Sequence, residues 1–240
     1  GVAMAGAVTG CAPMAVLGGL GALVHCLNHM LFKTTLFLAA GAVVHATRER
    51  SLERLGGLLR RMPFTGSIFL TGAAGAAAIP PLNGFIGEFL ILLGAARGVV
   101  SGIPAAVETG VVALLVLCLT GALALACFCR VAGVAFLGEP RAALASQPHD
   151  PGPWMRVPML AAACLCPLAL AATPWLLGPL ATALTLAADL PTGPVDAALA
   201  SAVVAVSAAA ALQVGILFSA GLLWLVRWQG LRRRVVGSAP

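Results

Sequence analysis

The residues best suited to chemistry lie close together in a long apolar stretch near the start of the chain. His25, Asn28, His29 and Lys33 fall within the segment HCLNHMLFK. In an α-helix, positions i, i+4 and i+8 advance by only about 40° per step, so the two histidines and the lysine form one stripe about 12 Å long. Histidine titrates near neutral pH, and a lysine held away from water releases its proton more readily. The spacing therefore predicts groups that take up and release protons.

The same stripe has a structural alternative, in which the histidines are packing residues and Lys33 extends its stem to the membrane surface. An ionisable side chain at membrane depth costs about 2.5 to 3.5 kcal/mol on insertion scales, so it faces a bundle interior, a partner or water. Lys33 lies in the middle of its apolar run. We therefore expect its side chain to be buried among helices and not to face lipid.

A second titratable group, Glu88, lies in the segment PPLNGFIGEFLI, one helical turn beyond Asn83 and Gly84. The residues from Pro80 to Gly84 are expected to interrupt the helix. In hydrocarbon, freed backbone groups are tolerated only where protein or water satisfies them, so such a break often lines a cavity. A carboxylate beside it has the chemistry of a proton gate. The alternative is a glutamate that stabilises a helix N-terminus through the helix dipole.

Two further ionisable residues are weaker candidates. Arg130 lies near the end of its apolar run and does not normally release a proton, so it is either a snorkelling or ion-paired residue or a fixed counter-charge. His45 lies beside a polar segment and is either incidental or the surface end of the relay. The sequence contains no nucleophile–base pair, metal-ligand cluster, phosphate-binding glycine loop or dinucleotide fingerprint. We therefore expect no catalytic residue, no metal and no cofactor on this chain, with redox cofactors on other chains.

The composition points to a membrane protein, because 60% of the residues are hydrophobic and only 9% are charged, whereas soluble domains carry about 25% charged residues. The net charge of +6 does not indicate nucleic acid, because the basic residues sit in short segments between the apolar ones. If the helices alternate strictly across the membrane, the arginines divide equally between its sides, so the positive-inside rule does not orient the chain. The seven cysteines lie mostly in apolar runs and are expected to be packing residues.

The elements that position these residues are expected to be about six transmembrane helices of about 20 apolar residues each. The first apolar stretch, Ala15 to Ala46, is longer than a bilayer core requires, so it must tilt, bend or break. The polar segment from Thr47 to Met62 is expected to lie outside the membrane, and Pro63 to begin the next helix. The later helices are expected at Pro63 to Ile79, Phe85 to Ala96, Val111 to Leu137, Pro158 to Leu180 and Ala197 to Trp228.

The polar stripe, the linker and the expected break together resemble a known family. The segments HCLNHMLFKTTLFLAAGAVVHAT, RLGGLLRRMP and IPPLNGFIGEFLIL are similar to the antiporter-like membrane subunits shared by respiratory complex I, Mrp-type cation/proton antiporters and energy-converting hydrogenases. HATRERSLERLGGLLRRMP and PPLNGF look most like the large membrane subunit of hydrogenase-4 and formate hydrogenlyase. The similarity extends from Ala15 to about Arg141 and covers only the C-terminal part of such a protein.

The resemblance implies roles for individual residues. Lys33 matches the lysine of the family's central hydrophilic axis, and His25 and His29 match its neighbouring histidines. Glu88 matches the lysine or glutamate beside the family's broken helix. In that family, such groups relay protons along water chains in the middle of the membrane. The family's first half, with a glutamate and a lysine on earlier helices, has no counterpart in this sequence.

Composition and resemblance together predict an all-α, polytopic transmembrane helix bundle with a broken helix near Pro80–Gly84. Residues 1–141 are expected to form the C-terminal half of an antiporter-like proton-translocation domain, and residues 142–240 to add further transmembrane helices. The expected location is the inner membrane of a bacterial or archaeal cell, with several membrane crossings.

The function implied by the resemblance is that of a non-catalytic, ion-translocating subunit of a redox-driven complex. The complex would be of the hydrogenase-4, formate hydrogenlyase or NADH:quinone oxidoreductase type and would move protons or sodium. Its partners are expected to be other membrane and peripheral subunits and the lipid bilayer, with no nucleic acid. Two alternatives stay open, namely a subunit of an Mrp-type cation/proton antiporter and a truncated copy that packs in a complex without transporting.

Overall fold

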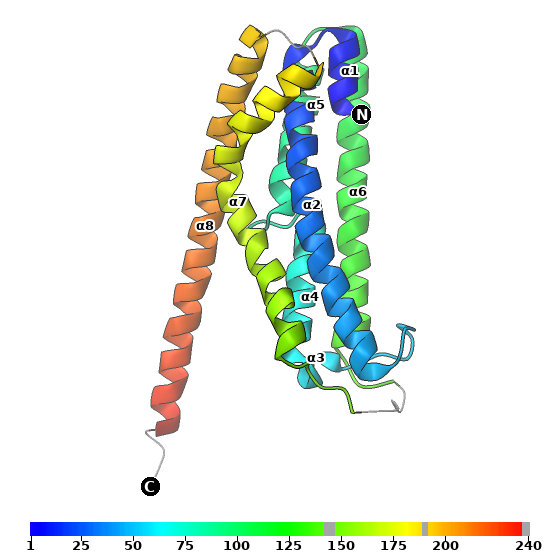
Figure 1. Ribbon diagram of the computed structural model, residues 1–240, viewed down its shortest axis with the longest axis vertical. Coiled ribbons are helices and arrows are strands. Elements are labelled where there is room, and N and C mark those ends of the chain that lie inside the picture. Colours follow the sequence, from blue (N-terminus) through cyan, green and yellow to red (C-terminus); the bar gives the residue numbers. More distant parts are fainter. Residues whose placement is uncertain (142–146, 189–191, 237–240) are drawn as a thin grey trace.

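The computed structural model describes residues 1–141, 147–188 and 192–236, and helices are the only regular elements in these ranges (Figure 1). Four of the helices, α2, α6, α7 and α8, are long and apolar enough to cross a membrane. The prediction of an all-α, multi-pass bundle is confirmed. The elements are α1 (Val2–Thr9), α2 (Ala12–Thr47), α3 (Leu58–Arg61), α4 (Pro63–Ala76), α5 (Gly84–Val99), α6 (Pro104–Phe136), α7 (Pro153–Ala188) and α8 (Thr192–Val236).

Helix α2 is the central element, and α4, α5 and α7 all pack along it. It is continuous over 36 residues, so the first apolar stretch does not break. The helix ends at Thr47 and is capped by Arg48, whose backbone N–H donates to the carbonyl of Val44 and whose φ of 56° is left-handed. Before it, α1 folds back onto α2 through Gly10, which has a φ of 75°.

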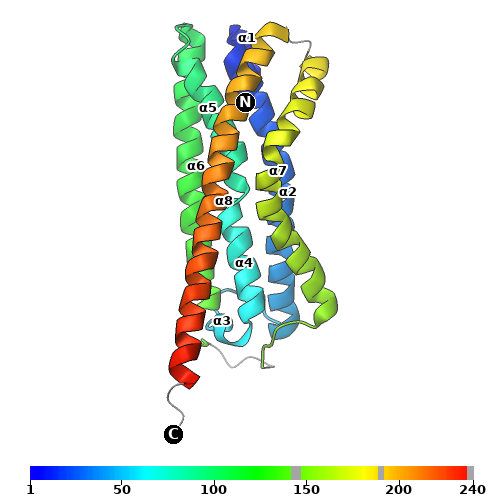
Figure 2. The same cartoon turned by 90° about the vertical axis from the view of Figure 1, so that its left-hand side faces the viewer.

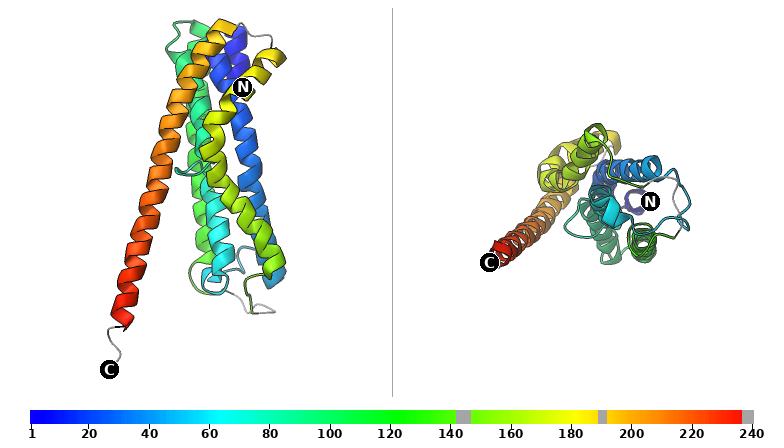
Figure 3. Two further views of the ribbon diagram at one scale, coloured as in Figure 1. Left: turned by 60° about the vertical axis from the view of Figure 1, so that its left-hand side comes forward. Right: turned by 90° about the horizontal axis from the view of Figure 1, so that it is seen from below.

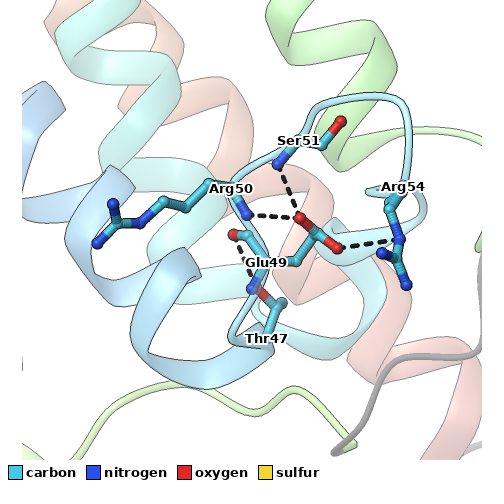
Figure 4. A network of polar contacts seen from close by, with 5 residues as sticks. All are labelled: Thr47, Glu49, Arg50, Ser51 and Arg54. Carbon is cyan, nitrogen blue, oxygen red and sulfur yellow. Dashed lines mark hydrogen bonds and ion pairs between the residues drawn. The ribbon is translucent and has the colours of Figure 1, made fainter.

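The polar segment after α2 is held together by its own hydrogen bonds (Figure 4). The Glu49 carboxylate accepts hydrogen bonds from the backbone N–H groups of Arg50, at 2.8 Å, and Ser51, at 2.9 Å. It also pairs with Arg54 at 3.0 Å, and the Thr47 hydroxyl oxygen accepts a bond from the N–H of Glu49 at 3.2 Å. The N–H groups of Ser51 and Arg50 lower the pKa of Glu49 below its ordinary value.

Helix α4 begins at Pro63, as predicted, and its first turn is capped from a distant part of the chain. The carboxylate of Asp150 accepts bonds from the backbone N–H groups of Phe64, at 3.0 Å, and Thr65, at 2.9 Å, and from the Thr65 hydroxyl at 2.8 Å. These N–H groups have no partner within the helix, so a side-chain acceptor there is stabilising. The loop before α7 is thereby fixed to the N-terminal end of α4.

Residues 77–83 are not helical, and they separate α4 from α5. Helix α4 ends at Ala76, three residues earlier than predicted, and Ala78 follows with a left-handed φ of 51°. The two helices follow one another along α2 with this segment between them (Figure 2). Asn83 therefore lies in a non-helical interruption, whereas Gly84 is already the first residue of α5. That α4 and α5 form the two halves of one broken transmembrane helix stays a prediction.

The three long C-terminal helices extend beyond their predicted bounds. Helix α6 begins seven residues earlier than predicted, at Pro104, and α7 runs to Ala188 although it contains Pro158, Pro167, Pro174 and Pro179. Helices α7 and α8 lie on one side of α2 and α5, and α1 and α6 lie on the other side (Figure 3). The main core cluster joins α2, α5, α7 and α8 through Leu20, Val24, Ile86, Leu90, Leu170, Leu177 and Val206.

Candidate functional site

The predicted stripe lies along one side of α2, and its residues differ in exposure. His25 is half-buried, whereas His29 and Lys33 are exposed. The imidazole rings of His25 and His29 have centroids 5.9 Å apart. The buried ring of Phe32 packs edge-on against both, at 6.2 Å from His25 and 5.1 Å from His29. The structure therefore brings the two histidines together.

The expectation that Lys33 is buried among helices is wrong for this chain, because its side chain lies on the open surface of α2. The other helices cover the adjacent side of α2, where Asn28, Phe32 and Thr35 are buried. No hydrogen bond or ion pair joins Lys33 to a residue in the described part of the chain. The described part of the chain therefore leaves Lys33 uncovered.

Helix α5 crosses α2 in very close contact at His25. A Cβ atom at Gly87 would lie only 2.6 Å from the Cα of His25. One turn further along α5, the backbone nitrogen of Ile91 lies 2.7 Å from the position of a Cβ at Gly21. Glycines on both helices therefore allow the two backbones to touch, with α5 running antiparallel to α2.

This crossing places Glu88 at the level of His25. Glu88 follows Gly87 by about 100° around α5, on the side away from the core residues Ile86 and Leu90. Seven residues further on, Ala95 lies on the same side of α5 and packs against Gly110 of α6. The Glu88 side chain is half-buried, and no hydrogen bond or ion pair joins it to a described residue.

The titratable groups follow one another along the axis of α2. From the crossing at His25, the stripe continues past His29 to Lys33, which lies eight residues and about 12 Å further along the helix. Glu88 is therefore next to the His25 end of the stripe and not next to Lys33. The structure brings His25 and His29 together, places Glu88 one residue from the contact of Gly87 with His25, and leaves Lys33 at the far end of the stripe.

A cavity opens beside this site, between α1, α2, α5 and α6. Its volume is about 710 Å³, and Ala22 of α2 and Ile91 of α5 are among its lining residues. Ile91 stands one helical turn from Glu88 on the same helix. The walls are mostly apolar, with Glu108 and Thr109 of α6 as the polar exceptions. The cavity approaches the Glu88 side of the crossing.

Two buried amides join the non-helical segment to α2. The side-chain nitrogen of Asn83 donates to the side-chain oxygen of Asn28 at 3.2 Å and to the backbone carbonyl of Asn28 at 3.3 Å. Both side chains are almost fully buried. Asn83 Oδ1, Asn28 Nδ2 and the nearby His25 Nδ1 are buried without a hydrogen-bond partner. Sequence analysis singled out each asparagine but did not predict that they would pair.

Arg130 is not brought to this cluster. It is exposed on α6, and no ion pair joins it to a described residue. Gly110 lies opposite Ala95, so Arg130 is about 20 Å further along the bundle axis than Glu88. Arg130 therefore does not contact Glu88, and its role as a fixed counter-charge stays a prediction. His45 is exposed at the last turn of α2.

Sequence analysis missed a buried amide on α8. Gln213 is 2% exposed, and neither its nitrogen nor its oxygen has a hydrogen-bond partner. It follows Val206 by seven residues, so it points to the side of α8 that packs into the core. The signal was present, because Gln213 is the only amide between residues 197 and 228. In the described part of the chain, no group of histidine, cysteine, aspartate or glutamate residues could hold a metal ion.

The family described as "NADH:quinone oxidoreductase/Mrp antiporter, TM" matches residues 2–138. Hydrogenase-4 component B of Escherichia coli is 39% identical over 73% of this chain and 26% of its own length. Formate hydrogenlyase subunit 3 of the same organism is 42% identical over 71% of this chain and 28% of its own length. A protein of Rhizobium meliloti, described as part of a probable K⁺/H⁺ antiporter, is 34% identical over 62% of this chain and 15% of its own length.

The matched region spans about a quarter of the length of the first two relatives. A solved structure of an Mrp complex from Dietzia sp. is similar with a TM-score of 0.48 and 22% identity. That likeness covers 78% of this chain and 41% of the other.

Proposed function

Because the chain belongs to the NADH:quinone oxidoreductase/Mrp antiporter transmembrane family, we propose that it carries part of the proton path of a redox-driven membrane complex. The family is that of antiporter-like membrane subunits, and its relatives include components of hydrogenase-4 and formate hydrogenlyase. Those relatives are named as components or subunits, so membership of a multi-subunit assembly is expected of this chain. The proposed parent is of the hydrogenase-4 or formate hydrogenlyase type, or of the NADH:quinone oxidoreductase type.

The predicted location is confirmed at the level of a multi-pass inner-membrane protein. Four helices are long and apolar enough to cross a membrane, and the family is a transmembrane one. The two similar Escherichia coli proteins are bacterial. Within this frame, residues 1–141 are proposed as the C-terminal half of a proton-translocation domain. Residues 142–240 are proposed to add transmembrane helices. Within this range, residues 142–146, 189–191 and 237–240 lie outside the described part of the chain.

The observation that carries the proposal is the crossing of Gly87 over His25, which places Glu88 at one end of the α2 stripe. A proton on Lys33 would pass to His29, then to His25 and then to Glu88, or in the reverse order. His25 and His29 are close enough for one bridging water, since their ring centroids are 5.9 Å apart. Each step moves one proton between a nitrogen or oxygen lone pair and a neighbouring water, and no covalent bond to carbon changes.

The exposure of His29 and Lys33 fits a protein that works only in a larger assembly. A charged lysine that faced lipid would be costly, so this side of α2 requires a protein or water partner. We propose that a neighbouring protein surface covers the stripe and confines water along it. Such a cover would leave the Glu88 side next to the cavity between α2 and α6.

A second candidate function is that of an Mrp-type cation/proton antiporter component. It is favoured by the 34% identity to the Rhizobium meliloti antiporter protein. The same residues would then exchange protons against sodium or potassium without an electron donor. A third reading, a copy that packs in a complex without transporting, predicts no proton movement through these residues.

The test uses membrane vesicles that contain the assembled parent complex. Proton uptake is measured with a pH-sensitive dye beside the redox turnover, first for the native chain and then for Glu88→Gln and Lys33→Met. Both variants should lower proton uptake at least about tenfold, because a general acid or base contributes about 10² to 10⁴, while redox turnover stays measurable. Glu53→Gln, a matched carboxylate change on the exposed loop after α2, should leave uptake unchanged.

The proposed path fails if Glu88→Gln and Lys33→Met both assemble and move protons at the native ratio to redox turnover. Uptake driven by a sodium or potassium gradient in the absence of an electron donor would favour the antiporter instead. Vesicles in which even the native complex moves no protons would favour the non-transporting copy.

A further inference from the structure

The buried amide pair lies where the non-helical segment meets the histidine stripe. Asn28 is on α2 between His25 and His29, and Asn83 is the last residue before α5. Asn83 Nδ2 donates twice to Asn28, to the side-chain oxygen and to the backbone carbonyl. That carbonyl belongs to the interior of an unbroken helix. A single side chain therefore attaches the non-helical segment to one turn of α2.

Close packing around the asparagine pair restricts the movement of residues 77–83 in addition to these hydrogen bonds. A Cβ atom at Gly84 would collide with the carbonyl oxygen of Gly75, so the two ends of the segment touch. A Cβ at Gly75 would lie 3.1 Å from the Cβ of Phe32 and 3.4 Å from Asn83 Oδ1. The close approach of these backbones brings α4, α5 and α2 together at one point.

The position of Glu88 depends on the place where Asn83 contacts Asn28 of α2. Glu88 is five residues beyond Asn83, and α5 begins between them at Gly84. The next contact of α5 with α2 is that of Gly87 with His25. The start of α5 is therefore held against α2 at two places, by the amide pair and, one turn later, by the glycine crossing. Of these two contacts, the amide pair is the directional one, because its hydrogen bonds require a particular orientation.

We propose that Asn28 and Asn83 are a positioning pair, which fixes the start of α5 against α2 and thereby sets the place of Glu88 relative to His25. The pair does not carry protons itself, because a carboxamide does not titrate in the physiological range. This positioning role adds to the proposed function. It rests on the proposed function only for its expected effect on proton transport. The geometric part is independent of whether the complex moves protons.

The unpartnered atoms around the pair agree with this role. Buried polar groups in folded proteins are almost always hydrogen-bonded, either to protein or to water. Asn83 Oδ1 and Asn28 Nδ2 have no hydrogen-bond partner, and His25 Nδ1 is buried and unpartnered on the adjacent turn of α2. Water bound to these atoms would join the pair to His25 of the relay.

The experiment combines hydrogen exchange of the intact chain with proton uptake of the assembled complex. Asn83→Leu removes both hydrogen bonds, whereas Asn28→Leu removes only the side-chain acceptor and keeps the carbonyl. Exchange of the amides in residues 77–88 should rise by about tenfold or more for Asn83→Leu and by less for Asn28→Leu. Thr35→Val, a matched change at a buried polar residue of the same helix, should leave exchange in residues 77–88 unchanged.

The double variant Asn28→Leu with Asn83→Leu separates positioning from simple stabilisation. Replacing both partners by apolar groups leaves no orphaned amide, so thermal stability should recover relative to the single variants. Because the directional bonds are still absent, exchange in residues 77–88 should stay high and proton uptake should stay low. A merely structural pair would instead recover exchange and uptake together with stability.

Unchanged exchange in residues 77–88 of Asn83→Leu would overturn the proposal, and so would recovery of exchange in the double variant. Raised exchange in a complex whose native form moves no protons would leave the positioning pair in place and overturn only the proposed function.

Discussion

The backbones of α5 and α2 touch at Gly87 and His25, where an added Cβ would lie 2.6 Å from a Cα atom. The contact joins the helix that carries Glu88 to the helix that carries the histidines. It involves backbone and Cβ atoms, which cannot rotate away as the end of a long side chain can. The relative position of the proposed relay groups is therefore set by the absence of a side chain at residue 87.

Gly87→Ala should destabilise the chain because the added methyl group forces the two helices apart. Overpacking of this kind costs about 1 to 3 kcal/mol. The free energy of unfolding of the detergent-solubilised chain, measured by denaturant titration, should fall by that amount. The matched control is Gly41→Ala in α2, where nothing lies within 4 Å of the new methyl group. The control should be neutral or stabilising by up to about 1 kcal/mol, and equal effects of the two changes would contradict the close crossing.

Asp150→Ala should weaken the start of α4, since the carboxylate accepts three hydrogen bonds from Phe64 and Thr65. Loss of a helix N-cap costs about 0.5 to 2 kcal/mol. The same unfolding measurement is compared with Glu139→Ala, which removes an ion pair with Arg60 in which both side chains are more than 80% exposed. Exposed pairs contribute little, so Glu139→Ala should cost less than Asp150→Ala. The reverse order would show that the Asp150 bonds do not form in solution.

The loop after α2 should lose stability in acid because of Glu49. The N–H groups of Ser51 and Arg50 lower the pKa of Glu49 below its ordinary value of 4.5. A carboxyl group with a depressed folded-state pKa stabilises the fold above its ordinary pKa. That contribution disappears as the pH falls through the folded-state pKa. The thermal midpoint of the native chain should therefore exceed that of Glu49→Gln at pH 6, and the difference should shrink as the pH falls below 4.5.

The control for this pH dependence is Glu53→Gln. Glu53 lies on the same loop, is exposed and makes no hydrogen bond or ion pair to a described residue. Its substitution should leave the thermal midpoint unchanged at both pH values. A difference between the native chain and Glu49→Gln that does not shrink between pH 6 and pH 3 would assign the effect to something other than the ionised carboxylate.

Much of the helical order could be predicted from the sequence, because hydrophobic runs and proline or glycine signals mark it. The start of α4 at Pro63 and the non-helical segment before Gly84 are examples. The bounds of α7 were predicted less well, since Pro158, the predicted start, lies inside a helix that runs from Pro153 to Ala188. Isolated prolines are poor boundary signals in an apolar helix, where neighbouring helices can satisfy freed carbonyl groups.

The sequence did not show which side of α2 the other helices cover. For this reason Lys33 was wrongly expected to be buried. Apart from the polar stripe, α2 is apolar all round, so no amphipathic pattern marks its inner face. The inner face is instead determined by where α5 can approach, which depends on Gly21 and Gly87. Asn28 and Asn83 are 55 positions apart in the sequence. Because no local sequence pattern indicates which distant residue an asparagine contacts, their pairing could not be predicted.

The central claim is that His25 and Glu88 lie on one proton path, and a double-mutant comparison tests it most directly. Proton uptake per redox turnover is measured in vesicles of the assembled complex for His25→Gln, for Glu88→Gln and for both changes together. Groups that act in one path are non-additive, so the double variant should lose no more than the worse single variant. If instead the two losses multiply, or if either single variant keeps the native ratio, His25 and Glu88 do not share a path.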